Sequence, residues 1–347
     1  MENSGPTEKP ARRELYLDNL KVFLTVLVIF HHAGQAYSGS DNWAYHPSLD
    51  ERAVWLRNFF AVNASFFMGL FFLISGYFVP PSYDRHGFGR FVRAKFIHLG
   101  IPLLVVTALC SAIMHQVEFA HLWFVEHLLF YSLAYALFRL AVRKPLSVPG
   151  RLNFGWILGA AVVIAAGSLL LRPRWPINTW VLFGGFLRME PAHFPQYIVL
   201  FVSGMAAWRG DWFRGMTRRM GAVLLGIGLL MALMVYLRPL SPFLQSWIGS
   251  SWWGYESFLS VFLSFGLVAL FRFRFDRAPR VMRWLAAQSY AAYIVHIFVV
   301  LGLQVLFDRV PMGGGTGKFL FIALAGTAVS YGAAYLLRCI PGVGRVV

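Results

Sequence analysis

The chain alternates long apolar stretches with short polar ones along almost its whole length. A helix needs ~20 apolar residues to cross a bilayer. Stretches that approach this length fall at about 17–38, 55–79, 96–116, 121–141, 154–171, 193–209, 220–237, 254–271, 287–307 and 319–338. The polar stretches between them are too short to build a core of their own. The pattern therefore predicts an all-α, polytopic membrane bundle of about ten transmembrane helices, formed as a single domain over residues 14–347.

Composition supports this prediction. Of 347 residues, 58% are hydrophobic and only 13% are charged, a profile typical of membrane proteins rather than soluble ones. Residues 1–13 are polar and are predicted to form a disordered cytoplasmic tail. They do not resemble a cleaved signal peptide.

The net charge of +16 records topology rather than a nucleic-acid partner. Most basic residues gather in alternate polar segments, around 9–21, 85–95, 139–151, 209–219, 272–283 and 338–345. Cytoplasmic loops of membrane proteins carry such an excess of Lys and Arg. Both termini are therefore predicted to be cytoplasmic. A basic cytoplasmic surface would also suit a phosphorylated substrate.

Two adjacent histidines lie inside the first apolar stretch, LKVFLTVLVIFHHAGQAY. Ionisable side chains at membrane depth are costly and usually mark a functional site. Asp18, Lys21, Thr25 and His32 share one helical stripe at ~100° per residue, whereas His31 points about 100° away. His32 is therefore the histidine aligned with other polar groups.

A carboxylate lies inside the segment HLWFVEHLLFY. Glu126 shares a helical face with Trp123 by its three-residue spacing. His32 lies ~16 Å along the helix axis beyond Lys21, a depth comparable to that of Glu126. A contact between His32 and Glu126 across two helices is our hypothesis from these depths.

A third polar stripe runs through the segment SYAAYIVH, where Ser289, Tyr293 and His296 recur at helical spacing. In membranes Ser, Asn and Gly commonly serve helix packing instead of chemistry. That alternative applies to Ser289 more than to His296. The aromatic outer loops also permit two interpretations, interfacial anchoring or a platform on which a sugar stacks.

The histidines do not follow a metal-binding pattern. Adjacent residues diverge on a helix, and the chain has no HExxH or CxxC motif, so we predict no metal site. Haem ligation by His32 with His127 or His296 is left open. The two cysteines are far apart in sequence and predict no disulfide framework.

Four blocks together resemble the acyltransferase-3 family of membrane acyltransferases, which includes O-acetylases of bacterial surface polysaccharides. The blocks are LDNLKVFLTVLVIFHH, FFLISGYF, HLWFVEHLLFY and SYAAYIVH. In the family, the first block carries an arginine and, eleven residues later, a histidine essential for transfer. The matching positions here are Lys21 and His32. Lysine keeps the charge but loses the bidentate fork of arginine.

The family also usually holds two arginines before the segment Gly100-Ile101-Pro102. Here Lys95 and His98 occupy those positions, and Arg90 and Arg93 lie nearby. Family members often carry an extra extracytoplasmic domain, which we do not find in this chain. The resemblance therefore implies either a stand-alone transferase or one that works with a separate extracytoplasmic partner.

The resemblance implies transfer of an acyl group, by analogy acetyl, from cytoplasmic acyl-CoA to a hydroxyl of a carbohydrate or other envelope acceptor. We expect His32 to act as base or transient acyl carrier, oriented by Glu126. The expected substrate contacts are Asp18, Lys21, Arg93, Lys95, Trp123, Tyr293 and His296. We expect a multi-pass protein of the bacterial inner membrane, in contact with lipid, with no bound cofactor and no nucleic-acid partner.

Two other classes remain open at this point. A proton-coupled secondary transporter could use Asp18, His32, Glu126 and His296 as its polar path. The lack of an internal repeat counts against it. A non-catalytic membrane subunit would use the buried polar groups only for assembly.

Overall fold

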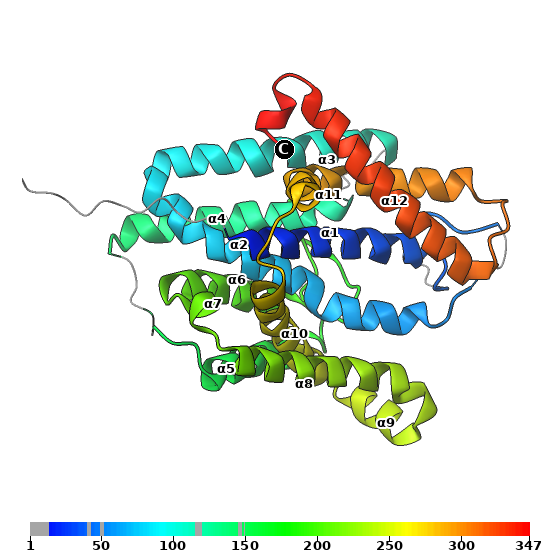
Figure 1. The fold of residues 1–347 in the computed structure, drawn as a ribbon, viewed down its shortest axis with the longest axis horizontal. Coiled ribbons are helices and arrows are strands. Elements are labelled where there is room, and N and C mark those ends of the chain that lie inside the picture. Colours follow the sequence, from blue (N-terminus) through cyan, green and yellow to red (C-terminus); the bar gives the residue numbers. More distant parts are fainter. Residues whose placement is uncertain (1–13, 40–42, 49–51, 115–119, 145–147, 149) are drawn as a thin grey trace, which may run out of the picture.

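The computed structural model describes residues 14–39, 43–48, 52–114, 120–144, 148 and 150–347 (Figure 1). The predicted disordered tail, 1–13, lies outside this range. The long helices are α1 (Leu15–Gln35), α2 (Leu56–Lys95), α3 (Ile101–Met114), α4 (Trp123–Ala141), α5 (Phe154–Leu171), α6 (Phe194–Arg209), α8 (Arg218–Leu237), α10 (Trp252–Arg274), α11 (Arg280–Leu306) and α12 (Gly314–Cys339). The shorter elements are a π-helix η1 (Phe96–Gly100), η2 (Ala120–Leu122), α7 (Trp212–Gly215), η3 (Arg238–Leu240), α9 (Pro242–Ser250) and η4 (Val343–Arg345), with an antiparallel hairpin of β1 (Val181–Phe183) and β2 (Leu187–Met189).

The all-α membrane bundle is confirmed. Within the described residues, eight helical segments are long and apolar enough to cross a membrane. One of them, Leu56–Ala112, contains two of the predicted segments and turns back on itself at Gly87, where φ is 68° (Figure 1). A positive φ is cheap only for glycine. The predicted segment 193–209 corresponds to α6, which is shorter at 16 residues.

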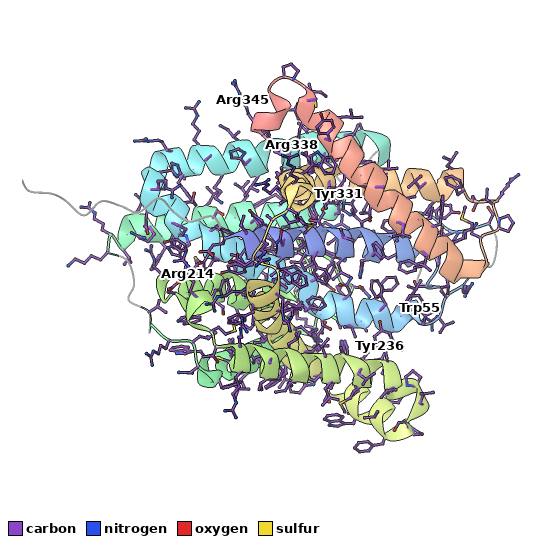
Figure 2. All side chains as sticks on the ribbon, viewed as in Figure 1. Trp55, Arg214, Tyr236, Tyr331, Arg338 and Arg345 are labelled. Carbon is purple, nitrogen blue, oxygen red and sulfur yellow. The ribbon has the colours of Figure 1, made fainter. Side chains whose placement is uncertain are left out.

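The two ends of the bundle differ in character. Helices α4 and α6 end in Arg139 and Arg209, and Arg214 follows in α7. Figure 2 shows Arg214 at the opposite end of the bundle from Trp55 and Tyr236. We call these the basic end and the aromatic end. The charge rule assigns the basic end to the cytoplasm.

Two of the helix starts on the basic side, those of α5 and α8, carry side-chain caps. Asn153 accepts a hydrogen bond from the amide of Trp156 at the start of α5, and Thr217 accepts one from Met220 at the start of α8. Such caps satisfy backbone donors that have no partner within the helix. The helices therefore begin where the polar loop residues meet the apolar stretches.

The backbones of α2 and α6 touch where both helices carry glycine. A Cβ added at Gly76 would lie 2.1 Å from the carbonyl oxygen of Phe201, and one at Gly204 would lie 2.0 Å from that of Leu73. Small residues permit such close approach in membranes. Close helix packing therefore explains the glycine in the block FFLISGYF, which is Gly76.

Helix α1 lies between two apolar cores. One core contains Leu20 and Leu24 with much of α2, α6 and α10, and the other contains Ile29 and Ala33 with α11 and α12. At the basic end, Asn19 Nδ2 donates to the carbonyl of Phe275 at 2.6 Å and to that of Arg277 at 2.8 Å. These bonds fix the entry of α1 to the loop between α10 and α11.

We expect Gly76→Ala to lower the free energy of unfolding by about 1–3 kcal/mol, the usual cost of overpacking, because the added methyl group meets backbone. The check is thermal unfolding in detergent. Gly226→Ala is the matched control, since a Cβ at Gly226 meets nothing within 4 Å. Equal melting temperatures for the two variants would contradict the close contact.

Candidate active site

Four histidines meet near the aromatic end of α1. His31 and His32 belong to α1, His121 to η2 and His296 to α11. The ring of His296 lies between two others, with centroids 5.1 Å from His32 and 4.8 Å from His121. His31 and His32 are 5.7 Å apart, nearly perpendicular. Segments from three parts of the chain thus build one imidazole cluster.

The adjacent histidines have different environments. His31 is buried, its Nδ1 accepts a hydrogen bond from Asn63 Nδ2 at 3.1 Å, and its ring stacks on Phe67. His32 is only partly buried, and its Nδ1 lies 3.3 Å from Gln35 Oε1. Since that oxygen accepts, Nδ1 carries the proton and Nε2 keeps its lone pair. His32 is therefore the member of the pair that can meet a substrate.

Trp43 covers His32. Its ring stacks on the imidazole at 5.3 Å with an interplanar angle of 25°. The indole Nε1 donates to Gln304 Oε1 at 2.7 Å, and Gln304 Nε2 donates to the carbonyl of Ala33 at 3.2 Å. Because Gln304 holds both the loop and α1, the stacking geometry is set by α11.

The other two rings of the cluster are oriented by the backbone of α11. His296 Nδ1 donates to the carbonyl of Tyr293 at 2.6 Å, and His121 Nε2 lies 3.0 Å from the carbonyls of Tyr293 and Ile294. The Tyr293 hydroxyl donates back to the carbonyl of His121 at 2.6 Å. The opposite ring nitrogens, His296 Nε2 and His121 Nδ1, are buried without a hydrogen-bond partner among the described residues. Both are acceptors.

At the basic end of α1, Asp18 and Lys21 form an ion pair. Lys21 Nζ lies 2.8 Å from Asp18 Oδ1, and Thr25 Oγ1 donates to the carbonyl of Lys21. The ammonium also sits 5.3 Å above the ring of Phe78 in α2. Lys21 is partly exposed and lies at the opposite end of α1 from His32.

Glu126 and Trp123 form a separate group on α4. Glu126 is buried, and its Oε2 accepts a hydrogen bond from the backbone amide of Arg188 in β2 at 3.1 Å. The Trp123 ring stacks on Tyr197 at 5.3 Å and lies near Trp180. No hydrogen bond joins His32 to Glu126 in the part of the chain described. The partner of His32 is Gln35.

The residues that match the family's second basic pair lie around the π-helix η1. Arg93 is exposed, and Lys95 Nζ sits 5.3 Å above the ring of Phe91. His98 binds the carbonyl of Val346 through Nδ1, and its own carbonyl accepts a hydrogen bond from Tyr290. Single π-helical turns often occur at functional sites. Here the turn connects the bent α2 limb with α11 and the C-terminal segment.

A second buried polar cluster fastens the hairpin at the aromatic end. His193 lies between two carboxylates, 2.7 Å from Glu190 Oε2 and 3.0 Å from Glu256 Oε1, and Arg172 contacts the same Glu256 at 2.6 Å. Burial alone would lower the pKa of His193, but the two carboxylates raise it to about 10. The imidazole is therefore charged at neutral pH and ties α5, α6 and α10 together.

No group of three or more His, Cys, Asp or Glu among the described residues is arranged to hold a metal ion. Cys110 and Cys339 do not form a disulfide.

The acyltransferase domain model of the acyltransferase-3 family matches residues 14–338. The chain belongs to the acyltransferase-3 family. It is 35% identical over 102 residues to glucans biosynthesis protein C of Escherichia coli K12 and of Shigella dysenteriae serotype 1. Those alignments cover 29% of this chain and 26% of each relative, so they span about a quarter of the relatives' length. No solved structure matches the chain.

The chain therefore carries the acyltransferase domain of this family in a protein with several helices long and apolar enough to cross a membrane. Of the residues singled out from sequence, the fold brings His32, His296 and Tyr293 into one site and leaves Asp18 and Lys21 at the other end of α1. Sequence reasoning missed four contacts of this cluster, namely Gln35, Trp43, His121 and Gln304. His121 stood in a recognised block, and Gln35 follows His32 by three residues on the same helix, a spacing that the sequence shows. Trp43 and Gln304 carry no local signal, because only tertiary packing places them near His32.

We expect Gln304→Leu to free Trp43 and to raise the rate at which diethyl pyrocarbonate modifies His32 by about fivefold, the equivalent of one buried hydrogen bond. Mass spectrometry of the modified peptide measures the rate. Gln245→Leu, at an exposed position in α9, is the control. An unchanged rate in Gln304→Leu would show that Gln304 does not hold the cover in place.

We also expect stability to depend on His193. Its folded pKa, about 10, exceeds the ordinary value of 6.5. A raised pKa stabilises the fold fully below the unfolded value, and that contribution is lost as pH rises through the folded value. The melting temperature should therefore fall more steeply between pH 7 and pH 10 in the wild type than in His193→Gln. Parallel curves for the two proteins would contradict a charged His193.

Proposed function

We propose that the enzyme transfers an acyl group, acetyl by family analogy, from cytoplasmic acyl-CoA to a hydroxyl of a carbohydrate acceptor in the cell envelope. The accessibility of His32 carries the proposal, because it is the one partly exposed ring in a cluster of otherwise buried histidines. The printed name of the relatives, which refers to glucans, supports a carbohydrate acceptor. The basic inner loops favour a cytoplasmic donor.

The chemistry assigned to His32 follows from its tautomer. Gln35 holds the Nδ1 proton, so Nε2 takes the proton of the acceptor hydroxyl. The oxygen then attacks the thioester carbonyl, the carbon–sulfur bond breaks, and the imidazolium returns its proton to the leaving CoA thiolate. A covalent acyl-histidine is the other route through the same nitrogen. Gln35 takes the orienting role expected of Glu126.

His296 is the proposed contact for the acceptor. The His296 ring lies next to that of His32. The Nε2 atom of His296 is buried without a hydrogen-bond partner among the described residues and can accept a hydrogen bond. A hydroxyl group would satisfy it, and buried polar groups rarely remain unpaired. Tyr293 supports this role by fixing the rings of His296 and His121.

The donor would enter from the basic end. Lys21 and Asp18 lie there, with Arg93 and Lys95 as further candidate contacts for phosphate. Lys21 is ~16 Å from His32 along α1, a distance that an extended pantetheine arm covers. The acyl group would thus cross the membrane within the bundle.

We expect His32→Gln to reduce acyl transfer by about 10²–10⁴-fold, the usual contribution of a general base. Radiolabelled acetyl-CoA and a glucan acceptor, with release of CoA and transfer of label as readouts, provide the measurement. His31→Gln is the matched control and should lose much less activity, provided that both variants keep the melting temperature of the wild type.

Equal loss in the two variants would contradict the assignment to His32. Absence of CoA release by the wild type with every carbohydrate acceptor tried would contradict the donor or the acceptor class. Proton-coupled uptake of a solute without CoA turnover would favour the transporter.

A further inference from the structure

A long apolar groove runs between α4 and α6, away from the histidine cluster. Its cavity volume is about 460 Å³, within the range of small-molecule sites. Its apolar lining includes Ala134, Phe138, Ile198, Phe201, Val202 and Met205. None of the four clustered histidines lines it.

The groove opens sideways on the flank of the bundle. Phe138 is 42% exposed and Val202 is 49% exposed, although both belong to helices of the membrane bundle. An exposed apolar rim at this depth faces lipid chains. The opening therefore gives access from the bilayer.

Two guanidinium groups close the groove at the basic end. Arg139 and Arg209 share one carboxylate, with Arg139 Nη1 2.8 Å from Asp84 Oδ1 and Arg209 Nη1 2.6 Å from Asp84 Oδ2. Both also donate to the hydroxyl of Tyr135. Two positive charges meet one negative charge, so this end keeps an excess of one positive charge.

Two polar atoms in the groove lining are buried without a partner among the described residues. One is Nε of Arg139, whose side chain is 9% exposed, and the other is the hydroxyl of Tyr131. Buried donors without partners are rare in folded proteins. The unpaired Nε of Arg139 indicates a ligand with an acceptor oxygen at its head, whereas the Tyr131 hydroxyl lies eight residues, ~12 Å, further along α4.

The length of the groove matches one leaflet. Ile198 and Arg209 are 11 residues apart on α6, ~16 Å along the axis. The hydrocarbon of one leaflet is about 15 Å deep, half of the ~30 Å core. An acyl chain that starts at the arginines would thus reach Ile198.

We propose that this groove binds one anionic phospholipid of the leaflet at the basic end. Its phosphate accepts hydrogen bonds from Arg139 and Arg209, and one acyl chain lies between α4 and α6. A single excess positive charge matches one phosphodiester rather than the several phosphates of a CoA nucleotide. The proposal concerns lipid binding alone and does not depend on the donor or acceptor of the acyl transfer.

The test measures lipid binding to the delipidated full-length protein in detergent by native mass spectrometry. The probe is palmitoyl-oleoyl phosphatidylglycerol, and the matched zwitterionic probe is palmitoyl-oleoyl phosphatidylcholine. Phosphatidylglycerol should bind more tightly. Arg209→Gln should weaken it by about fivefold, the effect of one basic residue near a lipid headgroup, while leaving binding of phosphatidylcholine nearly unchanged.

A second variant tests the groove itself. Ala134 is exposed and lines the groove, so Ala134→Trp fills it without disturbing the core and should abolish the tight site. The control is Ala166→Trp, the same substitution at an exposed position of α5 outside the lining, and it should bind as the wild type does.

Equal affinity for the two lipids, or unchanged binding in Ala134→Trp, would overturn the proposal. Displacement of phosphatidylglycerol by glycerol phosphate would assign the site to a soluble phosphate. Displacement by acetyl-CoA would assign the groove to the donor. Either result rejects a lipid site while leaving the test of His32 unaffected.

Discussion

The direct backbone contact between α2 and α6 at Gly76 and Gly204 is the constraint on which the rest of the bundle depends. Inside a membrane, apolar surface gains little by leaving lipid, so helices associate through close packing and hydrogen bonds. The contact fixes α2, which carries Asn63 to His31, and α6, which carries His193 to its two carboxylates. A side chain at either glycine would meet a carbonyl oxygen of the other helix. The positions of both polar clusters therefore depend on the crossing of α2 and α6, where the two glycines have no side chains.

The histidine cluster illustrates how the bundle accepts polar groups at depth. His121 and His296 give their protons to backbone carbonyls of α11, and His31 accepts from Asn63. Each bond offsets the cost of burying a polar group in an apolar environment. His32 differs, because its partner Gln35 lies on its own helix and its ring remains partly accessible. The cluster thus fixes three rings by hydrogen bonds to other residues of the bundle, while His32 stays partly exposed.

Three regions of the molecule handle charge in different ways. At the aromatic end, His193 and Arg172 pair with two carboxylates, while Arg172 Nη1 is buried without a hydrogen-bond partner among the described residues. At the basic end, Asp84 neutralises only one of two arginines, and an apolar groove leads away from them into the bilayer. The ion pair of Asp18 and Lys21 lies near the start of α1, at the opposite end of the helix from the two adjacent histidines. The histidine cluster of α1, η2 and α11 thus lies apart from the groove between α4 and α6, whereas α6 contributes both to the groove and to the His193 cluster.

The sequence by itself determined the fold class and the membrane-spanning character, and it predicted that His32 rather than His31 has the functional role. Apolar length and helical period are local properties, and a ring that shares a stripe with Asp18 and Lys21 is readable from spacing. The predicted pair of segments around Gly87 also lies where the chain turns back. The structure has eight candidate membrane-spanning segments among its described residues, whereas about ten were predicted. The numbers differ because one helical segment continues through the bend at Gly87 and because α6 is short.

Only the tertiary structure decided which residues of other segments lie next to His32. Depth along a helix suggested Glu126, but depth says nothing about the direction in which a neighbouring helix faces. Glu126 instead accepts a hydrogen bond from the amide of Arg188. The residues of the cluster come from elsewhere: Trp43 from a loop, His121 from η2 and His296 from α11. Such neighbours depend on how helices rotate and cross, which is set by the glycine contacts and hydrogen bonds of the whole bundle rather than by any one segment.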